Sequence, residues 1–207
     1  MKEIVLYVEG DSDKAIVEEL LRHLTPGMHT VGVRLLPPRP AQGNSRLLDK
    51  ITAWAALGLR TFSTLAVFAL KDSDAPADQA GEILNKLAQA GAAKLAPGEV
   101  DRFHPHVAVP EIEAWLLADE EAVADYLRRF GVNLSESWPC PEHLFDGKAE
   151  LDKLFVKIPG FPRRYKPTTD GPLIARRVRP EIVAEKCPRF RAFIENLKRT
   201  AGLPVES

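Results

Sequence analysis

The amino-acid sequence predicts an α/β fold, in which helices flank a parallel sheet and a mainly helical C-terminal part follows. Strand and helix patterns alternate through roughly the first 110 residues, which is the order of elements in a sheet with crossover helices. The apolar run 65–70 is typical of a central strand that is covered on both faces. After Pro110 the pattern changes to helices and loops.

The alternating part carries four strand patterns separated by helix patterns. Strands are expected at 4–8, 31–36, 65–70 and 103–109, and helices at 12–24, 47–55 and 78–90. Ser12 is placed to cap the first helix, and Pro26 with the following glycine is expected to stop it. Proline and glycine in 37–44 indicate a loop. Pro105 removes a backbone donor from the fourth strand and favours either an edge position or a later start of the strand.

Beyond the fourth strand, the sequence predicts three further helices and a basic segment. The helices are expected at 111–119, 120–130 and 189–198. The segment 159–179 carries Arg163, Arg164, Lys166, Arg176, Arg177 and Arg179 against the single acid Asp170. Several dispersed cations of this kind suit the extended backbone of a nucleic acid, for which Arg163, Arg164, Arg176 and Arg177 are the candidate contacts.

Composition excludes several classes of protein. In 207 residues, 45% hydrophobic and 28% charged side chains describe an ordinary globular chain. The balance of 28 Lys and Arg against 29 Asp and Glu gives no global cationic field, although local patches could supply one. Cys140 and Cys187 lack metal-ligand spacing, which argues against zinc and a disulfide framework. Without a leader or membrane-spanning pattern, we expect a cytoplasmic protein that is neither exported nor membrane-embedded.

Carboxylates follow directly after two of the apolar runs. Glu9 and Asp13 come after 4–8, and Asp72 and Asp74 come after 65–70. In an open parallel sheet the carboxyl ends of the strands share one crevice, where ligands bind. Crowded carboxylates repel one another unless a cation neutralises them, and such oxygen ligands suit Mg²⁺ or Mn²⁺. The sequence therefore predicts a divalent-metal site.

Each acidic group also has a plain structural interpretation. Asp13 and its neighbours are typical helix-capping residues. Asp72 and Asp74 on an extended backbone would point the same way, yet two acids at this spacing also occur in ordinary polar turns. Glu111 and Glu113 follow the fourth strand, and because residues two apart on a helix do not face each other, at most one is expected to point into the crevice.

Together these residues resemble the Toprim domain of topoisomerases, bacterial primases and overcoming-lysogenization-defect nucleases. The resemblance begins with the acidic turn 9–13 and the Asp-x-Asp at 72–74. Later motifs resemble a stand-alone Toprim-like family of formerly unknown function and extend the resemblance over nearly the whole chain. They are the segment 109–119 (VPEIEAWLLAD), Lys148 before an apolar helix, Tyr165-Lys166-Pro167 and Cys187-Pro188-Arg189-Phe190.

The resemblance implies a metal-dependent nuclease or a close relative, working with an AAA-type or ABC-type ATPase in antiviral defence against phage. On that analogy Glu9 is the first-strand acid, and Asp72 and Asp74 hold the metal. Asp13 stands where the nuclease branch has a second acid, and Glu111 or Glu113 adds a ligand or a supporting partner. The analogy divides the chain into a Toprim-like metal-binding domain, 1–118, and a helical, basic C-terminal subdomain, 119–207. Lys71 departs from the family, which usually has an apolar or small residue there.

Two metal ions bridged by carboxylates can activate a water and stabilise the leaving oxygen of a phosphodiester, and a nearby cation would neutralise charge in the transition state. One ion or two is left open. Lys148 and Lys166 are the candidates, supported by Arg164, although any of them would also suit a solvated surface. Two other classes stay open: a non-catalytic Toprim-like module of an ATPase complex, and a phosphohydrolase acting on small molecules. DNA, tRNA and other RNA are all open as substrates, as is homodimerisation. No phosphate-binding loop of a P-loop ATPase is present in the sequence.

Overall fold

The computed structural model describes residues 1–41 and 46–205, and it confirms an α/β fold built on a parallel sheet. The strands are β1 (Lys2–Val8), β2 (Val33–Leu35), β3 (Arg39–Pro40), β4 (Thr64–Asp72) and β5 (Phe103–Ala108). Their order is β2-β1-β4-β5, with β3 also paired to β1, and each pairing is parallel. The edge position predicted from Pro105 is confirmed, since β5 pairs with β4 alone among the described strands.

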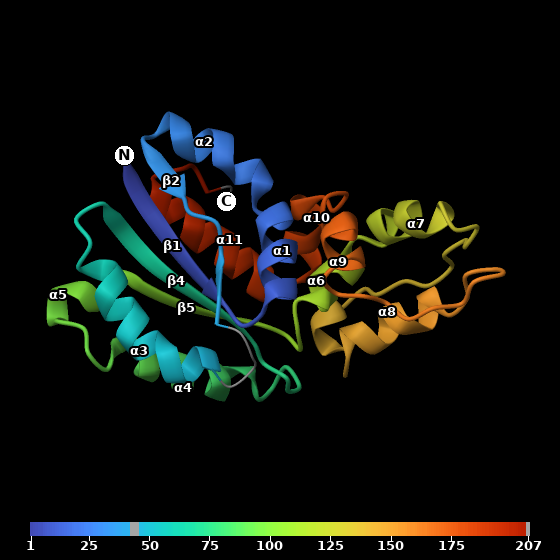
Figure 1. Ribbon diagram of the computed structural model, residues 1–207, viewed down its shortest axis with the longest axis horizontal. Helices are drawn as coiled ribbons and strands as arrows, with labels where there is room; N and C mark the ends of the chain where they lie inside the picture. The colour runs from blue at the N-terminus through green and yellow to red at the C-terminus, as the bar shows by residue number, and fades with distance from the viewer. Residues whose placement is uncertain (42–45, 206–207) are drawn as a thin grey trace.

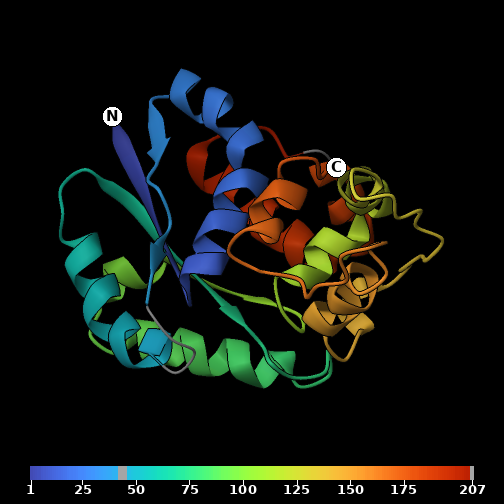
Figure 2. The same ribbon diagram turned by 45° about the vertical axis from the view of Figure 1, so that its right-hand side comes forward.

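Helices cover both faces of the sheet and continue beyond its carboxyl end. They are α1 (Asp11–Leu20), α2 (Thr25–Thr30), α3 (Arg46–Leu59), α4 (Ala80–Ala92), α5 (Pro97–Val100), α6 (Glu113–Ala118), α7 (Glu120–Arg128), α8 (Gly147–Phe155), α9 (Asp170–Ala175), α10 (Pro180–Lys186) and α11 (Pro188–Ala201), with 3₁₀ turns at Arg22–Leu24 and Pro141–His143. Figure 1 shows α3 and α4 on one side of the sheet and α1, α2 and α11 on the other. Helices α7 and α8 lie past the strand ends in both views (Figures 1 and 2).

The two sides of the sheet form two hydrophobic clusters because side chains alternate along each strand. Ile4, Leu6 and Val8 of β1 belong to the larger cluster, which also contains side chains of α1, α6 and α11. Val5 and Tyr7 of the same strand belong to the smaller cluster, with side chains of α3 and α4. The central strands are therefore buried on both faces, as the apolar run 65–70 predicted.

Several element boundaries differ from the sequence prediction. The first helix ends at Leu20, and Pro26 lies in the first turn of α2, where its missing N–H would have no helical acceptor. Val31 caps α2, so the strand predicted at 31–36 is shortened to β2. The predicted loop 37–44 includes β3, which pairs with the end of β1, and its residues 42–44 lie outside the described residues.

The C-terminal half is helical, as predicted, and it shares a core with the sheet. The larger hydrophobic cluster joins Phe68 of β4 to Trp115 of α6 and Phe193 of α11. The division at 118/119 stays a prediction. None of the helices in the described residues has the length and hydrophobicity to span a membrane.

Candidate metal centre

The carboxyl ends of β1, β4 and β5 bring the predicted acids to one edge of the sheet. Glu9 follows β1, Asp72 is the last residue of β4, and Glu111 lies between β5 and α6. These strands are neighbours in the sheet, so their ends are adjacent. The Ile112 N–H donates to Asp72 Oδ1 at 3.1 Å, which ties the end of β4 to the segment before α6.

Asp72, Glu111 and Glu113 form a compact group that we call the acidic triad. One carboxylate oxygen of each lies within 4.8 Å of those of the other two, and all three side chains are buried. The expectation that at most one of Glu111 and Glu113 faces the crevice is wrong. Helix α6 begins at Glu113, so Glu111 precedes it and the helical spacing on which that expectation depended does not apply.

Glu113 is the least satisfied member of the acidic triad. Its exposed fraction is 0%, and neither carboxylate oxygen has a hydrogen-bond partner within the described residues. Burial raises the pKa of Glu113 to about 8, although the nearby ammonium of Lys148 opposes the shift. A buried carboxylate without hydrogen bonds is costly, and a cation at its oxygens would remove most of that cost.

The acidic triad has the donor set of a hard divalent cation. Carboxylate oxygens are the ligands that Mg²⁺ and Mn²⁺ prefer in proteins. Oxygens on opposite sides of a bound Mg²⁺ are about 4 Å apart, so a group within 4.8 Å needs little closure to hold one. Burial, then repulsion from Asp13 and Glu113, raises the pKa of Asp72 well above its usual range, as expected of carboxylates crowded without a metal.

Lys148, near the start of α8, contributes a cation to the acidic triad. Its Nζ lies 2.7 Å from Glu111 Oε2, 3.6 Å from Glu113 Oε2 and 4.0 Å from Asp72 Oδ2. The Lys148 N–H also donates to Glu111 Oε1 at 2.6 Å. Burial opposes the charge of Lys148, but the carboxylates outweigh it and raise its pKa above the ordinary value. Lys148 therefore lies in the site, whereas the plain interpretation placed it on a solvated surface.

The glycine before Lys148 allows α8 to approach α6 closely. A Cβ at Gly147 would lie 3.0 Å from the Ala114 nitrogen and 3.3 Å from Glu113 Cβ. A larger residue would push the two helices apart and move Lys148 away from the acidic triad. Gly147 was not singled out in the sequence, because only the packing of α8 against α6 shows why it is needed.

Glu9 is paired with Lys71, and both side chains are buried. Lys71 Nζ donates to Glu9 Oε1 at 2.8 Å and to the Asp72 carbonyl oxygen at 2.9 Å. Glu9 Oε2 accepts the Asp72 N–H at 3.2 Å. Burial raises the pKa of Glu9 to about 7, although its bond to Lys71 opposes the shift. The role of Glu9 as a metal ligand stays a prediction.

Strand alternation separates Lys71 from the side chain of Asp72. Side chains 67 and 69 of β4 belong to the smaller hydrophobic cluster, whereas 68 and 70 belong to the larger. Because successive side chains of a strand point to opposite faces, Lys71 continues the first pair and Asp72 the second. The two residues thus serve different parts of the site.

Asp13 and Asp74 lie near the site but have other partners. Asp13 accepts hydrogen bonds from the Gly10 N–H at 2.9 Å and the Ser12 hydroxyl at 3.1 Å, which supports its capping interpretation. Asp74 lies past the end of β4 with φ 49°, so the extended backbone expected to align it with Asp72 ends before it. Its side chain is 52% exposed and lies 3.6 Å from Lys71 Nζ. Metal binding by either acid stays a prediction.

Most arginines of the basic segment are held by partners within the chain. Arg163 donates to both carboxylate oxygens of Asp170, at 2.6 and 2.8 Å. Arg176 pairs with Glu19, Arg177 donates to the Leu173 carbonyl, and Arg179 binds Asp119. Arg164 and Lys166 are exposed, and neither side chain forms an ion pair or hydrogen bond within the described part of the chain. Contact of these residues with nucleic acid stays a prediction.

Tyr165, between the two exposed cations, reaches the acidic triad. Its hydroxyl is buried without a hydrogen-bond partner in the described residues, and a Cβ at Gly171 would lie 2.7 Å from it. Burial, together with the negative charge of Glu113, raises the pKa of Tyr165 above its ordinary value. The sequence offered only the Tyr-Lys-Pro motif as a signal and gave no role for the tyrosine.

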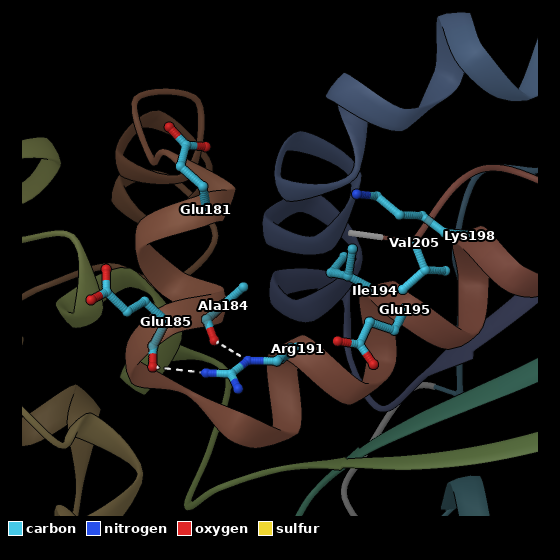
Figure 3. A pocket seen from close by; sticks show the side chains of 8 residues that line it. All are labelled: Glu181, Ala184, Glu185, Arg191, Ile194, Glu195, Lys198 and Val205. Carbon is cyan, nitrogen blue, oxygen red and sulfur yellow. Dashed lines mark hydrogen bonds between the residues drawn. The ribbon is translucent and has the colours of Figure 1, made fainter. Parts of the chain in front are cut away.

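Two cavities differ in their relation to the site. One, of about 220 Å³, adjoins the acidic triad and is lined by Asp74, Ala75, Pro76, Pro110, Glu111, Phe145 and Asp146. The other, of about 240 Å³, lies between α10 and α11, and Figure 3 shows its acidic and basic side chains. There Arg191 donates to the Ala184 and Glu185 carbonyls, and no described lining residue belongs to the acidic triad.

We expect the metal-free protein to lose stability between about pH 7 and 9. Glu113 and Glu9 have pKa values of about 8 and 7 when folded, against 4.5 for a free glutamate, so the unfolded chain binds fewer protons and unfolding becomes easier as pH rises. The pKa of His106 is lowered to about 3, which makes the folded protein more stable as pH rises. This opposite effect is largely complete by about pH 7, because unfolded histidines have lost most of their protons there.

Urea denaturation in EDTA at pH 7, 8 and 9 measures this loss, which we expect to be about 1–2 kcal/mol. In Glu113→Gln most of the loss should disappear, because the glutamine has no proton to release. A free energy of unfolding that stays constant or rises over this range in the wild type would contradict the electrostatics described above.

Comparisons with known proteins place the chain in one family. The family model described as "Domain of unknown function (DUF4276)" matches residues 8–198, as expected from motifs that extend over nearly the whole chain. No curated protein matches. Among solved structures, the chain is similar to the C-terminal region of the Xanthomonas campestris pv. campestris OLD protein, with 14% identity, a TM-score of 0.42, and 95% of this chain and 97% of that chain covered. The corresponding values for the C-terminal region of the Burkholderia pseudomallei OLD protein are 14%, 0.43, 93% and 98%.

Proposed function

This chain belongs to the DUF4276 family, and we propose that it is a divalent-metal-dependent nuclease that hydrolyses phosphodiester bonds of DNA or RNA. The observation that carries the proposal is Glu113, a buried carboxylate with no hydrogen-bond partner in the described residues, which converges with Asp72 and Glu111 at the end of a parallel sheet. The predicted Toprim-like resemblance supports the same reaction.

The residues of the site divide the chemistry among them. Asp72, Glu111 and Glu113 would hold Mg²⁺ or Mn²⁺ through carboxylate oxygens. When bound, the ion supplies Lewis-acid stabilisation and a more acidic water. The Lys148 side chain is 39% exposed, so its ammonium can leave the carboxylates and neutralise charge on a phosphate as the transition state forms. Lys166 and Arg164 are the remaining candidates for phosphate contact.

A polymeric substrate fits this surface better than an enclosed small molecule. The cavity beside the acidic triad has about 220 Å³, whereas ligand pockets for small molecules usually have about 300 Å³ or more. Arg164 and Lys166 are exposed on both sides of Tyr165, which reaches Glu113. Exposed cations beside a metal centre would hold an extended phosphate backbone.

The biological setting is part of the proposal and depends on the sequence resemblance. We propose an effector of antiviral defence that works with an AAA-type or ABC-type ATPase in the cytoplasm. Both cysteines are free, which is compatible with a reducing compartment. The resemblance supports DNA and RNA equally, so both belong in the assay.

We expect the purified chain to cleave labelled DNA or RNA when Mg²⁺ or Mn²⁺ is present and to stop when EDTA is added. Product lengths on a denaturing gel measure the cleavage, and a small phosphate ester is assayed in parallel. No cleavage with any divalent metal, with and without a candidate ATPase partner, would favour a binding module. Hydrolysis of the small ester alone would favour a phosphohydrolase.

A further inference from the structure

Two lysines lie among the acids of the site, and their side chains differ in exposure to solvent. The Lys148 side chain is 39% exposed, and its Nζ forms its short contact with Glu111. The Lys71 side chain is 9% exposed, and its Nζ lies among three oxygens, from Glu9, the Asp72 backbone and Asp74. Lys148 has solvent into which it can move, whereas Lys71 is almost fully enclosed.

The surroundings of Lys71 are those of a bound cation. Two oxygens lie at hydrogen-bond distance from its Nζ, 2.8 and 2.9 Å, and a third lies at 3.6 Å. One of them is a backbone carbonyl at the end of β4, which is fixed by the sheet. Glu9, the acid that the sequence assigned to the metal, has both oxygens in use, one by Lys71 and one by the Asp72 N–H.

We propose that the Lys71 ammonium is a permanent cation of the site, at the position beside Glu9 where a second divalent ion would otherwise bind. Each chain then binds one divalent ion, at the acidic triad. Glu9 is a positioning residue that holds Lys71 and the Asp72 backbone, and it is not a ligand of the ion. This inference depends on the metal site of the proposed function but not on nuclease activity.

Electrostatics favour this arrangement over a second ion. A divalent ion at Glu9 would lie beside the buried ammonium of Lys71, and like charges in a poorly solvated region repel strongly. Displacement of the ammonium would leave it without partners in the protein interior, at a cost of several kcal/mol. At the acidic triad the ion meets no such barrier, because Lys148 is free to leave.

Counting bound Mn²⁺ tests the proposal without any substrate. Equilibrium dialysis with Mn²⁺ alone, at pH 8, should give one ion per chain for the wild type. Lys71→Met should bind a second ion, because Glu9 and Asp74 then lack their cation. The double variant Glu9→Gln/Lys71→Met, which loses both charges, should return to one ion. If Lys71→Met does not fold, the number of ions bound by the wild type and the Mn²⁺ affinity of Glu9→Gln still test the proposal.

Glu9→Gln distinguishes a positioning residue from a ligand. The glutamine carbonyl can still accept from Lys71, so Mn²⁺ affinity should change less than about threefold, whereas Glu113→Gln should weaken it by at least about 100-fold. The role of Lys71 alone would be overturned if the wild type bound two ions or if folded Lys71→Met bound one. It would also be overturned if Glu9→Gln lost as much Mn²⁺ affinity as Glu113→Gln. No bound Mn²⁺ in the wild type would overturn the proposed metal site as well.

Discussion

Glu113→Gln is expected to lower metal-dependent cleavage on the order of 10³-fold while the protein stays folded. Glutamine keeps the shape of the side chain but has no charge, so the acidic triad loses the carboxylate whose two oxygens have no hydrogen-bond partner in the described structure. The metal-free variant should be at least as stable as the wild type at pH 8, because a carboxylate with a raised pKa is gone. Initial cleavage rates at saturating Mn²⁺ measure the effect.

The matched control for this variant is Glu150→Gln, which also exchanges a glutamate for glutamine but lies outside the acidic triad. Glu150 lies on α8 and pairs with Lys153 at the surface. It should keep wild-type cleavage and wild-type Mn²⁺ affinity. Cleavage by Glu113→Gln at more than about a tenth of the wild-type rate would show that Glu113 holds no catalytic ion.

Asp170→Ala is expected to reduce the free energy of unfolding by about 3–5 kcal/mol. Asp170 begins α9 and is buried. Its carboxylate accepts from Arg163 twice, from the Tyr126 hydroxyl at 2.7 Å and from the Lys166 N–H at 2.8 Å. Alanine would leave a partly buried guanidinium and a buried phenol without their acceptor, which is the costly way to break an internal ion pair.

Urea denaturation at pH 7 measures this loss, and Arg176→Ala provides the comparison. Arg176 is exposed and pairs with Glu19, so its removal should cost about 0–1 kcal/mol. Equal effects of the two substitutions would show that the Asp170 cluster is no more important than a surface pair. Because the same cluster fixes the loop that carries Tyr165, Asp170→Ala should also weaken Mn²⁺ binding.

The sequence predicted the features that depend on local pattern and on sheet architecture. Apolar runs located the strands, and Pro105 correctly indicated an edge. The rule that parallel strands end at a common edge predicted that Asp72 lies close to an acid that follows the fourth strand, although two such acids, Glu111 and Glu113, lie there. That rule could not show that Glu9 pairs with Lys71, because this contact depends on the relative register of β1 and β4.

The sequence was a weaker guide where partners are distant or elements are short. The Lys148 contact with Glu111 spans 37 residues, and the packing of α8 against α6 is what creates it. Arg163 lies in a basic segment and was a candidate nucleic-acid contact, yet its guanidinium is paired with the Asp170 carboxylate. The expectation that Glu111 and Glu113 point apart was wrong, because it assumed helical spacing. The helix starts two residues later than predicted, so Glu111 lies before it and can turn toward Asp72.

The alternation along β4 limits how the gene can change length. Inserting or deleting one codon within this strand exchanges the faces of every later side chain, so residue 72 would point toward α3 and α4 and residue 71 toward α6. The Asp72 carboxylate and the Lys71 ammonium would then point to the opposite faces of the sheet, although the strand would still be apolar enough to fold into the sheet. Insertions in the connection between α7 and α8 leave that parity untouched. We therefore expect insertions and deletions among relatives to be confined to connections of this kind, whereas the number of residues in β4 should stay constant.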